Sequence, residues 1–285
     1  MVLSIDEALG MTIGTAIGDA LGAPLEFKES NEPHDYLIEM TGGGVHNTEA
    51  GEWTDDTAMM LGLMDAYLKN KGRLNHKDVM DNWIDWESKG LFQSRGKLFD
   101  IGITTSNALQ SYKDTSIPVQ GSTDINSSGN GNIMRIAPVI VANKDSLTDC
   151  IQDAVNQSKL THGSSMCLEY ASILAEELWT GKPLAKFKDY RHPLNIERHK
   201  VMSGGFIVET YQCSMWAFET SNSFEETVIK AINRGHDADT CGAVAGMIAG
   251  RIYGYKSIPQ KWLNKLHWKE KIYIQTTNLF KIKKT

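Results

Sequence analysis

Apolar residues recur every three or four positions along most of this chain, which is the pattern of helices that bury one face. Alternating runs typical of strands are scarce, and no Asn-Gly hairpin joins two such runs. We therefore predict an all-α fold. Patterns of helical length occupy residues 4–22, 54–70, 76–88, 104–112, 145–158, 163–180, 203–219, 223–233, 240–254 and, more briefly, 259–267.

Local signals place some helix ends. Ser4 and Glu7 have the spacing of a capping box, and Asp145 and Ser223 are candidate N-caps. Loops are expected in three stretches, none of which has the composition of a linker, so we predict one domain over residues 1–285. The loop stretches are 28–52, 113–133 and the charged segment 181–202.

Two of the predicted helices carry glycine at every fourth position, which keeps these glycines near one helix face. Each glycine costs about 1 kcal/mol of helix propensity relative to alanine. We expect close backbone approach to another helix or a ligand in return, although the last glycine of each series is equally explained as a turn or cap. The series are Gly10, Gly14, Gly18, Gly22 and Gly242, Gly246, Gly250, Gly254.

Composition narrows the class of protein. Hydrophobic residues make up 41% and charged residues 22% of 285 positions, and the net charge is -6, so a nucleic-acid partner is not expected. No apolar run is long enough to span a bilayer, and the N-terminus lacks the features of a signal peptide. Four scattered cysteines without a CxxC pair fit a reducing compartment. We therefore expect a cytoplasmic protein.

Two acidic clusters, far apart in sequence, share the same content of two aspartates and a threonine at the start of a predicted helix. Adjacent carboxylates repel, so burying them is costly without a cation. Mg²⁺ and Mn²⁺ prefer carboxylate, hydroxyl and water oxygens. Helix capping explains either cluster alone, whereas their recurrence favours a two-metal hydrolase site. The clusters are Thr54, Asp55, Asp56 and Asp237, Asp239, Thr240.

Three further acidic residues have two interpretations each. Asp19 lies among small residues on a glycine-bearing helix, where a structural hydrogen-bond acceptor is favoured over a catalytic group. Glu26 follows the helix break at Pro24 and could support the metal ligands or act as a base. Asp100, flanked by apolar residues before a helix, is either an N-cap or a base with a raised pKa.

A glycine-rich segment, Ser128–Arg135, could bind phosphate through backbone N–H groups, with Arg135 pairing with a phosphate or a carboxylate. It runs into an apolar stretch that we expect to end at Pro138. It lacks the Gly-Lys-Ser/Thr ending of a Walker loop. His162 precedes an apolar helix, and a capping or core role explains it when it is taken alone. HExxH, GxSxG and GxGxxG motifs are absent, which disfavours zincins, serine hydrolases and Rossmann enzymes.

Six motifs follow one another along the chain: GDALGAPLE, WTDDT, FDIGITT, GNGNIMRIAP, TH and NRGHDADTCGAVAGMIAGRIYG. In this order they resemble the ADP-ribosylglycohydrolase family, over about residues 10–255. The bacterial dinitrogenase-reductase-activating branch, which removes ADP-ribose from arginine, is the most similar. The chain departs from many members at His236, where they have glycine, which concerns the local shape of the pocket rather than the ligands.

The resemblance implies a single-domain orthogonal helical bundle that binds two divalent cations, Mg²⁺ or Mn²⁺. It implies that Asp100 is the catalytic base, that Glu26 lies near the metals, and that Phe206 stacks on adenine. The implied metal ligands are Thr54, Asp55, Asp56, Asp237, Asp239 and Thr240, and the implied substrate contacts are Gly129, Asn130, Gly131, Met134, Arg135, His162 and Phe206.

The function expected from this resemblance is hydrolysis of the N-glycosidic bond between ADP-ribose and an arginine of a modified protein. Hydrolysis of another ADP-ribose linkage, on serine, a nucleobase or a small metabolite, is a second hypothesis. A third is a non-catalytic protein that binds ADP-ribose or blocks a toxin partner sterically. Because both acidic clusters and Asp100 are intact, the first hypothesis is favoured; this argues against a purely structural role but leaves room for a steric second function.

Overall fold

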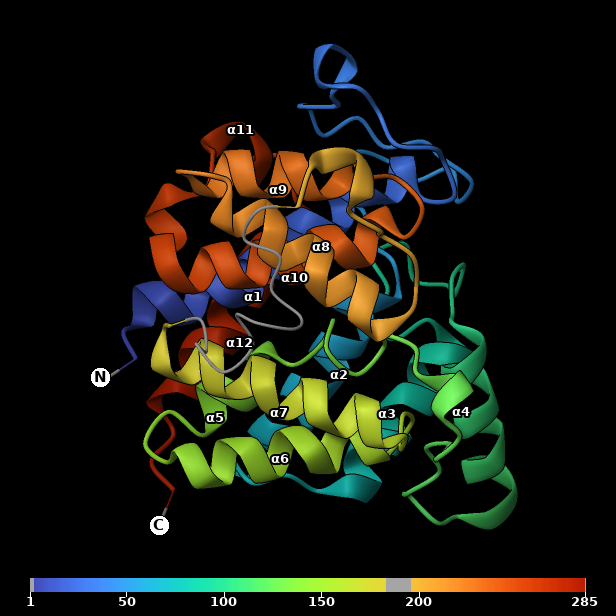
Figure 1. Cartoon of the computed structure of the whole chain (residues 1–285). Helices are drawn as coiled ribbons and strands as arrows, with labels where there is room; N and C mark the ends of the chain where they lie inside the picture. Colours follow the sequence, from blue (N-terminus) through green and yellow to red (C-terminus); the bar gives the residue numbers. More distant parts are fainter. Residues whose placement is uncertain (1–2, 183–195, 285) are drawn as a thin grey trace.

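The computed structural model describes residues 3–182 and 196–284, and these residues form α-helices and short 3₁₀ turns without a β-strand (Figure 1). The all-α prediction is confirmed. Most of the charged segment 181–202 lies outside the described residues. The helices are α1 (Ile5–Gly22), α2 (Asp55–Lys69), α3 (His76–Lys89), α4 (Ile103–Thr115), α5 (Ala137–Ala142), α6 (Leu147–Lys159), α7 (Ser165–Thr180), α8 (Ile207–Glu219), α9 (Phe224–Ile232), α10 (Ala238–Tyr253), α11 (Gln260–Leu263) and α12 (Lys269–Lys281).

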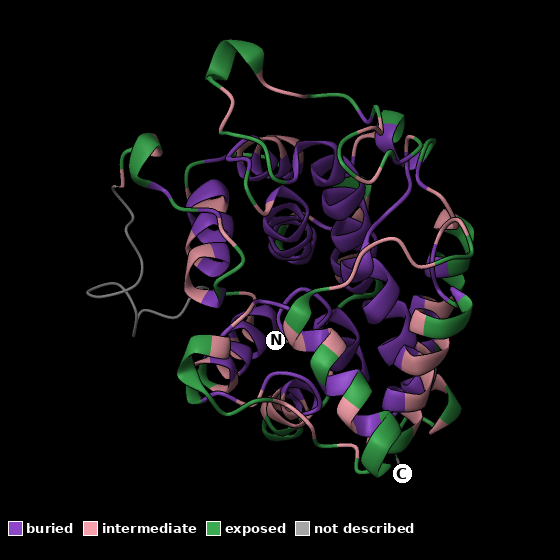
Figure 2. Cartoon of the chain, turned by 90° about the vertical axis from the view of Figure 1, so that its right-hand side faces the viewer, coloured by how far each residue is buried: buried purple, intermediate pink, exposed green. Residues whose placement is uncertain are grey.

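Helices α1 and α10 pack against each other at the centre of the bundle, and buried residues follow both along their length (Figures 1 and 2). Their glycines face one another in pairs whose numbers run in opposite directions, so the two helices are antiparallel. A Cβ atom on these glycines would overlap a backbone atom of the partner helix. The expected close helix–helix approach is therefore confirmed. The facing pairs are Gly10 with Gly250, Gly14 with Gly246, Gly18 with Gly242, and Gly22 with Ala238.

Helix starts follow local side-chain chemistry where a cap is available. The Ser4 and Glu7 capping box is present at α1, and the Ser223 side chain accepts the backbone N–H of Glu226 at α9. The prediction of Asp145 as the cap of α6 is wrong, because Ser146 accepts the N–H of Asp149 instead. One residue separates the two candidates, and a hydroxyl and a carboxylate cap with similar strength.

Two helices were missed by periodicity. Pro138 does not end an apolar stretch but lies in the first turn of α5, where a missing N–H costs no helical hydrogen bond. Helix α12 buries only Ile272, Thr276 and Leu279, a stripe too narrow to stand out. The Thr276 and Thr12 hydroxyls lie 2.8 Å apart, which joins α12 to α1.

The predicted helix 203–219 begins later, at α8, because residues 203–206 form a loop beside the glycine-rich segment. Phe206 bridges Gly129, and the N–H of Ile207 donates to the carbonyl of Ser128 over 3.0 Å. The prediction of one domain over residues 1–285 stays a prediction. Among the described residues, no helix is long and apolar enough to cross a membrane.

Candidate active site

A cavity of about 670 Å³ opens where the starts of α2, α4 and α10 meet the loops around residues 26, 129 and 204. Its volume lies in the range of sites for small molecules and cofactors. Most residues predicted from sequence contribute to its wall. These are Glu26, Asp55, Asp100, Gly129, Asn130, Gly131, Met134, His162, Asp237, Asp239 and Thr240.

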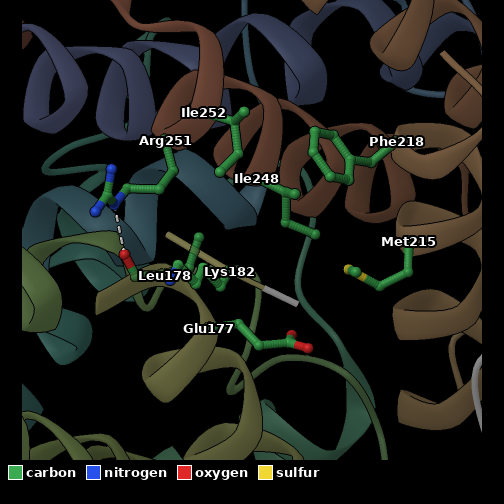
Figure 3. Close-up of a pocket in the computed structure, with 8 residues that line it drawn as sticks. All are labelled: Glu177, Leu178, Lys182, Met215, Phe218, Ile248, Arg251 and Ile252. Atoms are coloured by element: carbon green, nitrogen blue, oxygen red, sulfur yellow. Dashed lines mark hydrogen bonds between the residues drawn. The ribbon is translucent and has the colours of Figure 1, made fainter. Parts of the chain in front are cut away.

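A second cavity, between α7, α8 and α10, is an unsuitable binding site (Figure 3). Its wall is mainly apolar, with Met215, Phe218 and Ile248, and its volume is only about 20 Å³, room for about one water. The Arg251 guanidinium beside it donates Nε–H to the carbonyl of Leu178 over 2.6 Å. We therefore locate the candidate site at the larger cavity.

Two helix starts bring the acidic clusters to the larger cavity. Asp55 and Asp56 are the first residues of α2, Asp237 is the N-cap of α10, and Asp239 lies in its first turn. Neither N-cap residue, Thr54 or Asp237, makes a side-chain capping hydrogen bond. Helix capping therefore does not explain the two clusters, although negative charge still matches the N-terminal helix dipoles.

The start of α2 is capped instead by Asp19, which comes from α1. Asp19 Oδ1 accepts the backbone N–H of Thr54 over 2.8 Å, and Oδ2 accepts the N–H and hydroxyl of Thr57 over 3.0 and 2.7 Å. The Thr54 hydroxyl lies 3.0 Å from both Asp19 and Asp56. The structural interpretation of Asp19 is thus confirmed, and this contact anchors the first acidic cluster to the central helix.

Burial opposes ionisation of several carboxyl groups at the cavity. It raises the pKa of Asp55 to about 7, with added repulsion from Asp19 and Glu26, and it raises the pKa of Asp56 and of Asp239 well above the usual value. Burial, then repulsion by Asp55 and Glu26, raises the pKa of Asp100 to about 10. Groups that share one desolvated site in this way are typical of active sites and cation sites.

The donor set fits divalent cations. Asp56 Oδ1 and Asp239 Oδ1 are buried and have no hydrogen-bond partner. Carboxylate oxygens of Asp19, Asp56 and Asp239 lie within 4.8 Å of one another, as do those of Glu26, Asp237 and Asp239. Unpaired buried carboxylate oxygens are costly, and a cation bound by oxygen ligands removes that cost.

The metal-free protein is expected to lose stability as pH rises. A carboxyl whose pKa is raised by folding favours the folded state while protonated, and this contribution disappears as pH rises through the folded-state pKa. For Asp55 the affected window runs from 3.8 to about 7, and for Asp100 from 3.8 to about 10. We expect the unfolding temperature with chelator to fall between pH 5 and pH 9, as measured by differential scanning fluorimetry.

Adding Mg²⁺ or Mn²⁺ should raise the unfolding temperature, and more so at high pH, because protons compete for the same oxygens. Asp237→Asn serves as the control and should respond less to the cation. A metal-free stability that does not change with pH, together with no response to either cation, would contradict the cation site.

His46 is a site residue that the sequence analysis missed. Its Nε2 lies 2.6 Å from Glu26 Oε2 and 3.7 Å from Asp100 Oδ2, and the hydrogen bond with Glu26 raises the pKa of its imidazole. His46 therefore joins the two carboxylates whose roles the family resemblance suggested. The available signal was a histidine eight residues before Thr54 in a glycine-rich loop, which carries little information without the fold.

The glycine-rich segment is a buried turn rather than a flexible loop. The N–H groups of Gly129 and Asn130 already donate to the carbonyls of Ser127 and Gly205, over 2.8 and 3.1 Å. These two N–H groups are therefore engaged within the protein, and the phosphate contact of this segment stays a prediction. The Asn130 amide donates to Asp237 Oδ2 over 2.6 Å, so this turn also orients the second acidic cluster.

His162 lies at the wall of the cavity beside this turn. Its Nδ1 is 2.8 Å from the Thr161 hydroxyl, and burial followed by repulsion from Arg135 lowers its pKa to about 3. The imidazole is therefore neutral. A Cβ on Gly131 would lie 2.7 Å from the ring, so this glycine is needed for the ring to reach the cavity.

Arg135 does not line the cavity, and its predicted pairing with a substrate phosphate or carboxylate finds no support in its position. Its side chain is fully buried, with Nε donating to Gln157 Oε1 over 2.9 Å and Nη2 to the Thr161 hydroxyl over 2.8 Å. The guanidinium stacks on Trp83, with the centroid 4.0 Å away. Arg135 therefore supports the loop that carries His162 from below.

Phe206, predicted to stack on adenine, is the N-cap residue of α8 and is 38% exposed. It lies next to the glycine-rich turn through its bridge to Gly129, outside the wall of the cavity itself. Stacking on adenine stays a prediction. The structure places Thr54 and Asp56 beneath the cavity wall, both fully buried.

Comparison with known proteins agrees with this fold. The family model for ADP-ribosylglycohydrolase matches residues 3–283, and the chain belongs to that family. It is 33% identical to an ADP-ribosylarginine hydrolase Tri1 of Pseudomonas putida, over 97% of this chain and 78% of that protein. It is 31% identical to the ADP-ribosyl-[dinitrogen reductase] glycohydrolase of Rhodospirillum rubrum, over 93% of this chain and 91% of that protein.

A solved structure described as an ADP-ribosylglycohydrolase-related protein complex superposes with a TM-score of 0.82 at 33% identity, covering 98% of both chains. The fold of the described residues is therefore that of the family. More distant relatives include the human ADP-ribosylhydrolase ARH3, at 23% identity over 98% of this chain and 94% of that protein.

Proposed function

We propose that this protein hydrolyses the N-glycosidic bond between ADP-ribose and an arginine side chain of a modified protein. The observation that carries the proposal is that one cavity is lined by Asp100, by Asp55 of the first acidic cluster, and by the second cluster, Asp237, Asp239 and Thr240. The arginine linkage is supported by the relatives at 31–33% identity, which are named for arginine-linked or dinitrogen-reductase-linked ADP-ribose.

The residues proposed to hold two cations, Mg²⁺ or Mn²⁺, are the threonines and aspartates at the starts of α2 and α10. Such cations supply Lewis-acid chemistry, orienting hydroxyl groups and lowering the pKa of a bound water. Glu26 and its hydrogen bond to His46 complete the acidic wall next to Asp237 and Asp239. The ligands proposed are Thr54, Asp55, Asp56, Asp237, Asp239 and Thr240.

Asp100 is proposed to take the proton from the attacking water. It lies just before α4, and the next turn donates the N–H of Gly102 to Asp55, which holds the two carboxylates at one wall. A base must be ionised, and burial, followed by repulsion from Asp55 and Glu26, raises the pKa of Asp100 and disfavours that form. Positive charge at the neighbouring oxygens would lower the pKa of Asp100 and make it available.

The reaction itself suits this arrangement. Cleavage of a glycosidic bond passes through an oxocarbenium-like state, which negative groups near the ribose stabilise. The arginine leaving group keeps its proton at neutral pH, so it needs little acid assistance. Gly131, Met134 and the neutral His162 also line the cavity, and we propose that the rest of ADP-ribose lies along them.

The test is release of ADP-ribose from arginine-modified and serine-modified proteins in parallel, with Mg²⁺ or Mn²⁺ and with chelator. We expect release from the arginine-modified protein alone, and only with cation. Release from the serine-modified protein alone would replace the proposed linkage. No release from either substrate, combined with tight binding of ADP-ribose, would support a non-catalytic protein that acts on its partner sterically.

A further inference from the structure

Two residues at the mouth of the active-site cavity have backbone conformations that favour glycine. Phe27 has φ 60° and His236 has φ 55°, both in the left-handed region. Such conformations are strained for residues with a side chain. Phe27 directly follows Glu26, and His236 directly precedes Asp237, so both strained residues adjoin acidic residues of the cavity.

The two strained residues are held opposite each other by the backbone. The N–H of Phe27 donates to the carbonyl of His236 over 2.6 Å, and the N–H of His236 donates to the carbonyl of Lys28 over 2.7 Å. A third bond, from Asn31 N–H to the Asn233 carbonyl over 3.0 Å, extends this pairing. The conformation is therefore fixed by main-chain contacts, which glycine would satisfy equally well.

Neither side chain gains burial in exchange for the strain. Phe27 is 71% exposed, His236 is exposed, and both line the cavity. An exposed phenylalanine contributes little to folding, so the free chain gives no physical reason for these side chains. These side chains would contribute binding energy when another molecule covers them.

We propose that Phe27 and His236 form an aromatic rim that contacts the arginine-bearing segment of the modified protein. The proposal rests on the proposed function. Phe27 follows Glu26 and His236 precedes Asp237, so the rim adjoins the carboxylates where the scissile bond would lie. Guanidinium groups stack on aromatic faces, and the surrounding carboxylates favour a cationic segment.

The decisive variant is His236→Gly. Relief of backbone strain should raise stability, whereas loss of the rim should lower activity, so the two effects can be told apart. We expect a higher unfolding temperature and a kcat/KM for an ADP-ribosyl-arginine peptide reduced by roughly tenfold, the effect of one lost aromatic–cation contact. Affinity for ADP-ribose alone should remain unchanged. Phe27→Ser should reduce kcat/KM similarly, and Phe27→Tyr should restore it.

Lys71→Gly is the matched control, because Lys71 is also exposed, has φ 52° and adjoins a glycine, but lies at the end of α2 away from the cavity. It should raise the unfolding temperature without changing kcat/KM. The rim is refuted if His236→Gly leaves kcat/KM unchanged, or if it weakens ADP-ribose binding to the same degree.

Peptide affinity measured in an Asp100→Asn background separates the rim from the proposed function. Weaker peptide binding by His236→Gly in that background supports the rim even when the wild type hydrolyses nothing. Equal peptide binding by the two proteins refutes the rim, whatever the activity of the wild type.

Discussion

Asp239→Asn is expected to lose about a thousandfold in the release of ADP-ribose, while the metal-free variant unfolds at a higher temperature than the metal-free wild type. A bound cation stabilises the charge that develops in the transition state, and losing one of its ligands removes several kcal/mol of that stabilisation. Each 1.36 kcal/mol corresponds to about tenfold in rate. The stability gain has two sources: Asp239 Oδ1 is buried without a hydrogen-bond partner among the described residues, and a carboxylate oxygen of Asp239 lies within 4.8 Å of oxygens of Asp56 and Asp19. An amide there is neutral and can donate to a neighbouring carboxylate.

The rate of ADP-ribose release tests the predicted loss of activity, and the unfolding temperature measured with chelator tests the predicted gain in stability. Asp85→Asn, which removes a half-exposed partner of Lys89 on α3, is the control and should change neither quantity appreciably. A variant that keeps wild-type activity, or that is less stable than wild type without metal, would argue against Asp239 as a cation ligand.

Gly18→Ala is expected to destabilise the protein by about 3 kcal/mol or more, the upper part of the range for overpacking a core. Its Cβ would overlap the carbonyl of Gly242 on the antiparallel helix α10, and backbone atoms cannot rotate away as a side chain can. Separating α1 from α10 would also pull Asp19 away from the start of α2. Urea unfolding gives the free energy, and cation affinity reports the displaced site.

Gly102→Ala is the matched control for stability. Its φ is −67°, and a Cβ there meets no atom within 4 Å, so alanine should be neutral or slightly stabilising. Equal stability of Gly18→Ala and Gly102→Ala would mean that the two central helices are not closely packed.

Much of the helical architecture was predictable because its causes are local. Amphipathic periodicity and caps such as Ser4 and Ser223 act within one or two turns of the chain. The glycine series also predicted a close backbone approach. Glycine is costly in a helix, so a repeated series indicates a close contact that compensates for that cost. Periodicity failed for α5 and α12, which are short or bury a narrow stripe.

The two acidic clusters of the candidate site were predictable from the sequence, but the contacts that support them were not. The two acidic clusters were recognisable in the sequence because neighbouring carboxylates repel, and burying them is costly without a cation. The cap that Asp19 gives to α2, the hydrogen bond of His46 to Glu26, and the burial of Arg135 each join segments far apart in sequence.

The sequence by itself determined the helical class, the two acidic clusters and the glycine face, because composition and spacing carry that information within single elements. Only the tertiary structure decided which side chains meet at the cavity. It also decided which residues take left-handed conformations at the cavity mouth, because the pairing of residues 27–31 with 233–236 imposes them. Contacts between distant segments depend on how whole helices pack, and no local pattern records that packing.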